Sequence, residues 1–64
     1  MARLYRRLAG RLKEAGCEIR RQGKGSHEIW YSPVSGRTFS VPANIKSREL
    51  ANEILKQAGL PKAF

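Results

Sequence analysis

The residues best suited to chemistry lie together in one short stretch, Gly23-Lys24-Gly25-Ser26-His27. His27 is the only histidine of the chain, and histidine is the residue type whose imidazole gains or loses a proton near neutral pH. The two glycines allow backbone conformations, including positive φ, that other residues avoid. A lysine and a serine hydroxyl stand beside the imidazole. We therefore expect any catalysis by this chain to occur in this stretch.

Basic residues near His27 indicate a phosphate as its ligand. A lone histidine is more often a surface or structural residue, but beside a bound phosphodiester it can act as a general acid or base. RNA supplies its own nucleophile, the 2′-hydroxyl, so its cleavage needs neither a metal nor a covalent intermediate. We expect His27 to be catalytic. The expected RNA-binding positions are the neighbouring cations and the loop, whose backbone N–H groups can approach a phosphate: Arg20, Arg21, Lys24, Gly25, Ser26 and Arg37.

Size and charge restrict the partners. The 64 residues make one domain, expected to span positions 1–64, and a chain this short can hardly enclose a large cofactor, so none is expected. Thirteen Lys and Arg against five acidic residues give a net charge of +8. Such a charge indicates a polyanionic partner, either nucleic acid or an acidic protein. The alternative is a basic surface that only aids solubility.

Other familiar sites are excluded. Cys17 is the only cysteine, so it forms no internal disulfide and, with one histidine, no zinc site; we expect a buried free thiol. The glycine-lysine stretch is not a Walker A loop, because its lysine precedes the second glycine. Glu49 and Glu53 lie four residues apart, which indicates a charged helix surface.

No segment resembles a signal peptide or a membrane span, so we expect a cytoplasmic protein without a membrane partner.

Two helices are predicted at the ends of the chain. The first runs from Met1 to Gly16, because leucines recur every four residues along it and a glycine ends it. The second covers Arg48–Ala58, with Ser47 as its N-cap and Gly59 as its stop.

Three strands are predicted between the helices. Cys17–Gln22 alternates, with Cys17 and Ile19 on one face, and His27–Ser32 is rich in β-branched and aromatic residues. Arg37–Val41 alternates again until Pro42, and its short connection to the preceding strand predicts an antiparallel hairpin. The predicted class is α+β, in the order α-β-β-β-α, with a three-stranded antiparallel sheet and both helices on one face. The other face would be open to a partner.

Alternation leaves the direction of His27 unresolved. His27, Ile29 and Tyr31 share one face of a regular strand. Either Ile29 faces the core and His27 lies at the frayed start of the strand, beyond the helices, or Trp30 is the core residue. We expect the first arrangement. One of the adjacent aromatic residues should then be exposed, where it could stack on a base or pack against a protein.

Several segments together are similar to one protein family. The helix ending in AGC, the stretch QGKGSHEIW, the strand RTFSVP and the tail ILKQAGL resemble the HicA, or YcfA-like, toxins of bacterial toxin–antitoxin pairs over roughly Leu4 to Leu60. The resemblance implies a fold like a double-stranded-RNA-binding domain, an mRNA interferase with His27 as its catalytic histidine, and a HicB-type antitoxin that covers the site. Where the family commonly has a further histidine after Val-Pro, this chain has Ala43 and Asn44.

The leading hypothesis is therefore a metal-independent endoribonuclease that cleaves mRNA with His27 and is inhibited by a HicB-like antitoxin. A non-catalytic RNA-binding module on the same fold is the alternative. A third hypothesis is an interaction protein whose basic face serves only an acidic partner, and it predicts no salt-sensitive binding of RNA.

Overall fold

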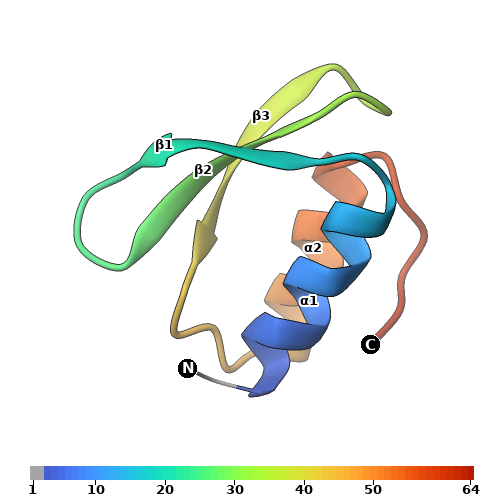
Figure 1. Ribbon diagram of the computed structural model, residues 1–64. Coiled ribbons are helices and arrows are strands. Elements are labelled where there is room, and N and C mark those ends of the chain that lie inside the picture. Colours follow the sequence, from blue (N-terminus) through green and yellow to red (C-terminus); the bar gives the residue numbers. More distant parts are fainter. Residues whose placement is uncertain (1–2) are drawn as a thin grey trace.

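The computed structural model describes residues 3–64 and confirms the predicted order of elements. Met1 and Ala2, the start of the first predicted helix, lie outside the described residues. The elements, shown in Figure 1, are α1 (Arg3–Glu14), β1 (Glu18–Gln22), β2 (His27–Ser32), β3 (Arg37–Pro42) and α2 (Arg48–Gln57).

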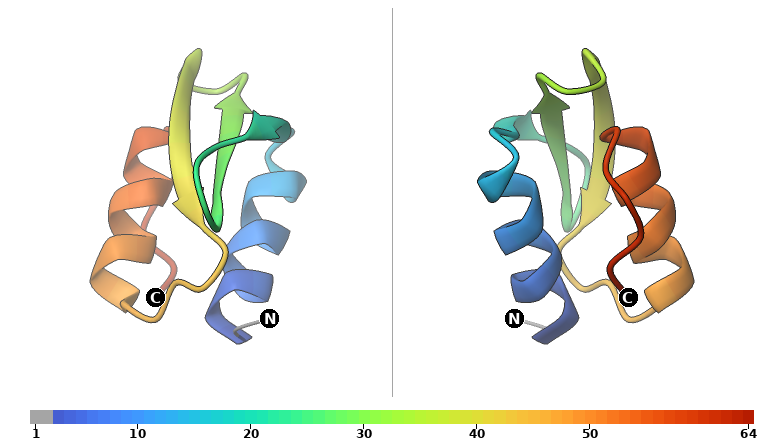
Figure 2. Two further views of the ribbon diagram at one scale, coloured as in Figure 1. Left: turned by 90° about the vertical axis from the view of Figure 1, so that its left-hand side faces the viewer. Right: turned by 90° about the vertical axis from the view of Figure 1, so that its right-hand side faces the viewer.

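The strands form one antiparallel sheet in the order β1-β2-β3, and both helices cover the same face of it (Figures 1 and 2). We call this the helix face and the opposite one the open face. The two helices run in the same direction, so both begin at the same end of the molecule (Figure 2). The segment that links β3 to α2 passes this end as well. The predicted packing of both helices on one face is therefore confirmed.

Trp30 decides which residues of β2 face the helices. Its side chain is fully buried in the core beside its cross-strand partner Phe39. Because side chains alternate along a strand, His27 and Ile29 project from the open face. The expectation that Ile29 faces the core was wrong, because the larger indole occupies the buried position and removes more apolar surface from water.

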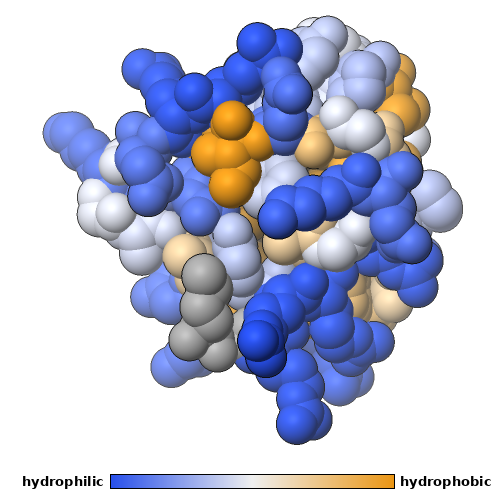
Figure 3. Space-filling view, viewed as in Figure 1, coloured by the Kyte–Doolittle hydropathy of each residue, from blue (hydrophilic) through white to orange (hydrophobic). Residues whose placement is uncertain are grey.

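A β-bulge interrupts β1. Ile19 pairs with Trp30 and Arg21 pairs with Ile29, which leaves Arg20 as the extra residue between them. The predicted regular alternation therefore holds as far as Arg20 and is wrong at Arg21, which pairs with Ile29 on the open face. Cys17 is buried as a free thiol just before the strand, as expected, but Ile19 is 44% exposed. In Figure 3, a hydrophobic spot near β1 is bordered largely by hydrophilic side chains.

The ends of both helices follow the local signals of the sequence. The Ser47 hydroxyl accepts a hydrogen bond from the backbone N–H of Leu50 at 3.1 Å, which confirms the N-cap. Gly16 and Gly59 each end a helix, and the N–H group after each glycine donates to a carbonyl five residues back. Leu60 packs against the core, the hydrophobic contact that often accompanies such a cap. β3 extends one residue further than predicted, to Pro42.

The C-terminal segment returns along α2. The side-chain amide of Asn52 donates to the carbonyl of Phe64 at 2.8 Å, and its oxygen accepts from the backbone N–H groups of Ala63 and Phe64. The guanidinium of Arg7 lies 5.2 Å from the centre of the Phe64 ring. These contacts join the segment to both helices and make Phe64 a contact of the core.

A polar cluster under β2 attaches the strand to α1. One carboxylate oxygen of Glu28 accepts a hydrogen bond from the Tyr5 hydroxyl at 2.5 Å and another from the Trp30 indole N–H at 3.1 Å. Burial, the hydrogen bond to Glu28 and the negative charge of Glu28 raise the pKa of Tyr5 from 10.0 to about 12. The cluster lies on the helix face, and its central residue, Glu28, directly follows His27. It therefore fixes this part of β2 against α1.

The pKa of Tyr5 makes stability depend on alkaline pH. Between pH 10 and about 12 the folded chain keeps the phenol proton while the unfolded chain loses it, so the unfolding free energy falls as pH rises. The loss across this window should approach about 3 kcal/mol, and the contribution is fully present below pH 10. Tyr5→Phe should weaken the fold at neutral pH by about 1 kcal/mol and flatten the alkaline decline.

Urea unfolding, measured at a series of pH values through this window, checks the prediction. Tyr31→Phe is a matched control on the opposite face of the sheet, and it should keep the decline caused by Tyr5. Identical alkaline declines in the parent and in Tyr5→Phe would contradict the assignment.

Candidate functional site

A tight turn presents His27. The backbone N–H of His27 donates to the carbonyl of Lys24 at 3.1 Å, and the N–H of Gly23 donates to the carbonyl of His27 at 2.8 Å. Gly25 has a φ of +61° and no other residue of the turn has a positive φ, which is the pattern of a type II′ turn with glycine at its first central position. The turn therefore closes the β1–β2 hairpin and places His27 at the first position of β2.

The segment after β3 holds this turn from the other side. His27 pairs with Pro42, and the backbone N–H of Ala43 donates to the carbonyl of Ser26 at 2.8 Å. The Ser26 hydroxyl donates to the side-chain oxygen of Asn44 at 3.3 Å. Asn44 was not among the predicted site residues. No local signal could have found it, because the contact joins positions eighteen residues apart in the chain.

Exposed polar groups surround His27 on the open face. Arg21 is the diagonal neighbour of His27 on the adjacent strand, a relation in which the two Cα atoms lie about 7 to 8 Å apart. Lys24, Gly25 and Ser26 are exposed in the turn itself. Within residues 3–64, the backbone N–H groups of Gly25 and Ser26 donate to no other group. The structure thus brings an imidazole, two cations and two free N–H donors to one end of the sheet.

The β-bulge in β1 places Arg20 and Arg21 together on this face. Its guanidinium lies 4.6 Å from the centre of the half-buried Tyr31 ring and 3.1 Å from a carboxylate oxygen of Glu18. Arg20 and Arg21 are adjacent in sequence, yet both belong to the open face because the bulge interrupts the alternation. One of the adjacent aromatic residues Trp30 and Tyr31 was expected to be exposed. Trp30 is buried, and Tyr31 is half-buried beneath Arg20.

Arg37 does not belong to the same group. It pairs with Ser32 at the far end of the hairpin, five residues along β2 from His27, which corresponds to roughly 17 Å. By this pairing it also lies on the side of the sheet that carries the buried Ser32. The structure therefore brings five of the six predicted RNA-binding positions to the open face or its turn and leaves Arg37 apart.

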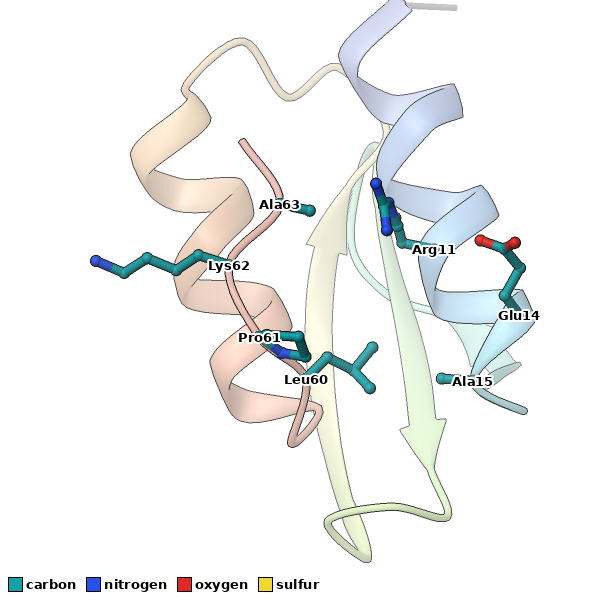
Figure 4. Close-up of a pocket in the computed structure, with 7 residues that line it drawn as sticks. All are labelled: Arg11, Glu14, Ala15, Leu60, Pro61, Lys62 and Ala63. Atoms are coloured by element: carbon teal, nitrogen blue, oxygen red, sulfur yellow. The ribbon is translucent and has the colours of Figure 1, made fainter.

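The candidate site is an exposed surface that includes Lys24, Ser26 and His27. A hollow of about 320 Å³ lies elsewhere, between the end of α1 and the C-terminal segment, and Figure 4 shows side chains that line it, among them Arg11, Glu14 and Leu60. No group of three or more metal-ligating side chains occurs among residues 3–64. Within the same residues, no helix is long and apolar enough to cross a membrane. An exposed imidazole among cations is suited to a polymer that passes over the surface.

The comparison with known protein families agrees with this arrangement. Residues 5–60 match the family model described as the HicA toxin of bacterial toxin–antitoxin systems. No curated protein and no solved structure was found to match the chain. The matched residues include the turn, all three strands and both helices apart from the first residues of α1. The chain therefore belongs to the HicA toxin family of bacterial toxin–antitoxin systems.

Proposed function

We propose that this HicA-family toxin is a metal-independent endoribonuclease, an mRNA interferase, in which His27 is the catalytic residue. The observation that carries the proposal is the exposed His27 on the open face, beside a turn that offers Lys24 and the free N–H groups of Gly25 and Ser26. An imidazole beside cationic and N–H groups that can bind a phosphate is suited to the cleavage of RNA. mRNA as substrate implies action in the cytoplasm.

The proposed reaction uses the 2′-hydroxyl of the RNA as nucleophile. His27, in its neutral form, takes the proton of this hydroxyl as the 2′-oxygen attacks the neighbouring phosphorus. The bond from phosphorus to the 5′-oxygen of the next nucleotide breaks, that oxygen takes a proton from solvent water as it leaves, and His27 then returns its proton to solvent. The products are one strand with a 2′,3′-cyclic phosphate and one with a free 5′-hydroxyl.

The turn and β1 would stabilise the negative charge that grows on the phosphate oxygens. Lys24 supplies a charge, and the N–H groups of Gly25 and Ser26 supply directed hydrogen bonds. Arg21 reaches the same phosphate or the next one from the neighbouring strand. Arg20 and Tyr31 form a flat surface further along the open face, suited to stacking on a base. Arg37 would contact only a longer RNA.

The family implies an antitoxin partner, and we propose a HicB-type protein that covers the open face. This face is not covered by either helix, and it carries the half-buried side chains of Ile29 and Tyr31. A protein seated there would occlude His27 and block access of RNA to the turn.

His27→Ala tests the catalytic assignment. The variant should cleave RNA at least 100-fold more slowly, because general acid–base catalysis typically contributes that much or more, and it should no longer arrest growth. Its stability should change by less than about 0.5 kcal/mol, since the side chain is exposed. Gel analysis of a labelled RNA, with and without a chelator, measures cleavage. Unchanged cleavage in the variant would refute the assignment, and binding of RNA without cleavage by the parent would favour a non-catalytic binding module.

The turn itself is tested by comparing two glycines. Gly25 (φ +61°) and Gly36 (φ +69°) both have positive φ, and an added Cβ at either meets nothing within 4 Å. Alanine at each should therefore cost a similar stability, about 1 kcal/mol. Only Gly25→Ala changes the backbone next to His27, so cleavage by this variant should fall well below that of Gly36→Ala. Rates of RNA cleavage at equal folded fraction make the comparison, and equal rates would mean that the turn geometry does not matter.

A further inference from the structure

A second basic surface lies at the end of the molecule where both helices begin. It is a groove of about 200 Å³ lined by Leu4 and four cationic residues, Arg3, Arg7, Lys46 and Arg48. All four cations are exposed, and no carboxylate is among the described residues that line the groove. The lower part of the surface in Figure 3, over the start of α1, is correspondingly hydrophilic. We call this the basic groove.

The direction of the helices adds to its positive potential. α1 and α2 both begin at this end of the molecule (Figure 2), and the first N–H groups of a helix carry a partial positive charge. Arg3 and Arg48 are the first residues of their helices. The four side-chain charges and two helix ends therefore act together on an anion in the groove.

The acidic residues of α2 do not neutralise this surface. Glu49 and Glu53 line a different hollow, together with Lys56 and Lys62. That hollow contains both signs of charge, whereas the basic groove contains only one. Folding brings four like charges to one small groove at an electrostatic cost, which a bound anion would offset.

The basic groove is connected to the His27 turn by a short segment. Asn44 accepts a hydrogen bond from Ser26, the residue before His27, and Lys46 follows Asn44 by two positions. Two residues of extended chain span at most about 7 Å. An extended polymer that touches the turn can therefore reach the groove within a few of its units.

We propose that the basic groove binds backbone phosphates of the same RNA that is cleaved at His27, on one side of the scissile bond; this rests on the proposed function. Arginine and lysine are suited to phosphate oxygens, and the groove is too small to enclose more than a few such groups. The RNA would run from the open face past the segment after β3 to the beginning of the two helices.

The test measures binding of RNA by the His27→Ala variant, so that the strand stays intact. Lys46→Gln and Arg48→Gln together remove two charges from the groove, and Lys56→Gln with Lys62→Gln removes two charges from the mixed hollow as a matched control. Fluorescence anisotropy with an end-labelled single-stranded RNA is recorded over a range of salt concentrations. The groove pair should weaken binding roughly tenfold and lower the salt slope by about 1.4, while the control pair should change both much less.

Other outcomes would overturn the proposal. Equal losses in both pairs would mean that only net charge matters. Unchanged RNA binding in the groove pair, with reduced affinity for a co-purified acidic antitoxin, would assign the groove to a protein partner instead. Failure of the proposed function would appear as an absence of RNA cleavage by the parent chain. The anisotropy experiment measures binding and needs no cleavage, so the two failures can be told apart.

Discussion

The burial of Trp30 is the constraint on which the rest of this structure depends. Because the indole fills the space between the sheet and the two helices, every second residue of β2 is assigned to the helix face. His27 stands at an odd spacing from it and must therefore project from the open face. The indole N–H and the Tyr5 hydroxyl also share one oxygen of Glu28, which opposes sliding of β2 along α1. The position of the imidazole thus follows from packing in the core.

Signals that act within a few residues were sufficient to predict most of the fold. The cap at Ser47, the glycine stops and the proline near the end of β3 each depend on the backbone near one residue, so they are visible in a single sequence. The choice between Ile29 and Trp30 was not visible, because both are apolar and alternation alone permits either to face the core. The bulge at Arg20 was missed because it is a property of the pairing between two strands.

The same distinction applies to the candidate site, in which some residues could be predicted from local sequence and others could not. His27 and its turn could be identified from residue types, since histidine, lysine and glycine occur together there. Asn44 could not, because its contact with Ser26 exists only after β3 returns beside β2. Arg37 lies only ten residues after His27 in the sequence, but the hairpin places it at the far end of the sheet. A chain of 64 residues has little room for a pocket, so its candidate binding groups are spread over an open surface.

The bulge in β1 also affects how copies of this chain meet one another. β1 is an edge strand of the sheet, and a regular edge strand offers unpaired backbone groups on which another strand can add. The extra residue at Arg20 breaks the regular spacing of those groups, and the like charges of Arg20 and Arg21 disfavour the approach of the same residues of a second copy. The bulge that brings two arginines together on the open face therefore also makes β1 a poor edge for pairing with another copy of this small and strongly basic chain.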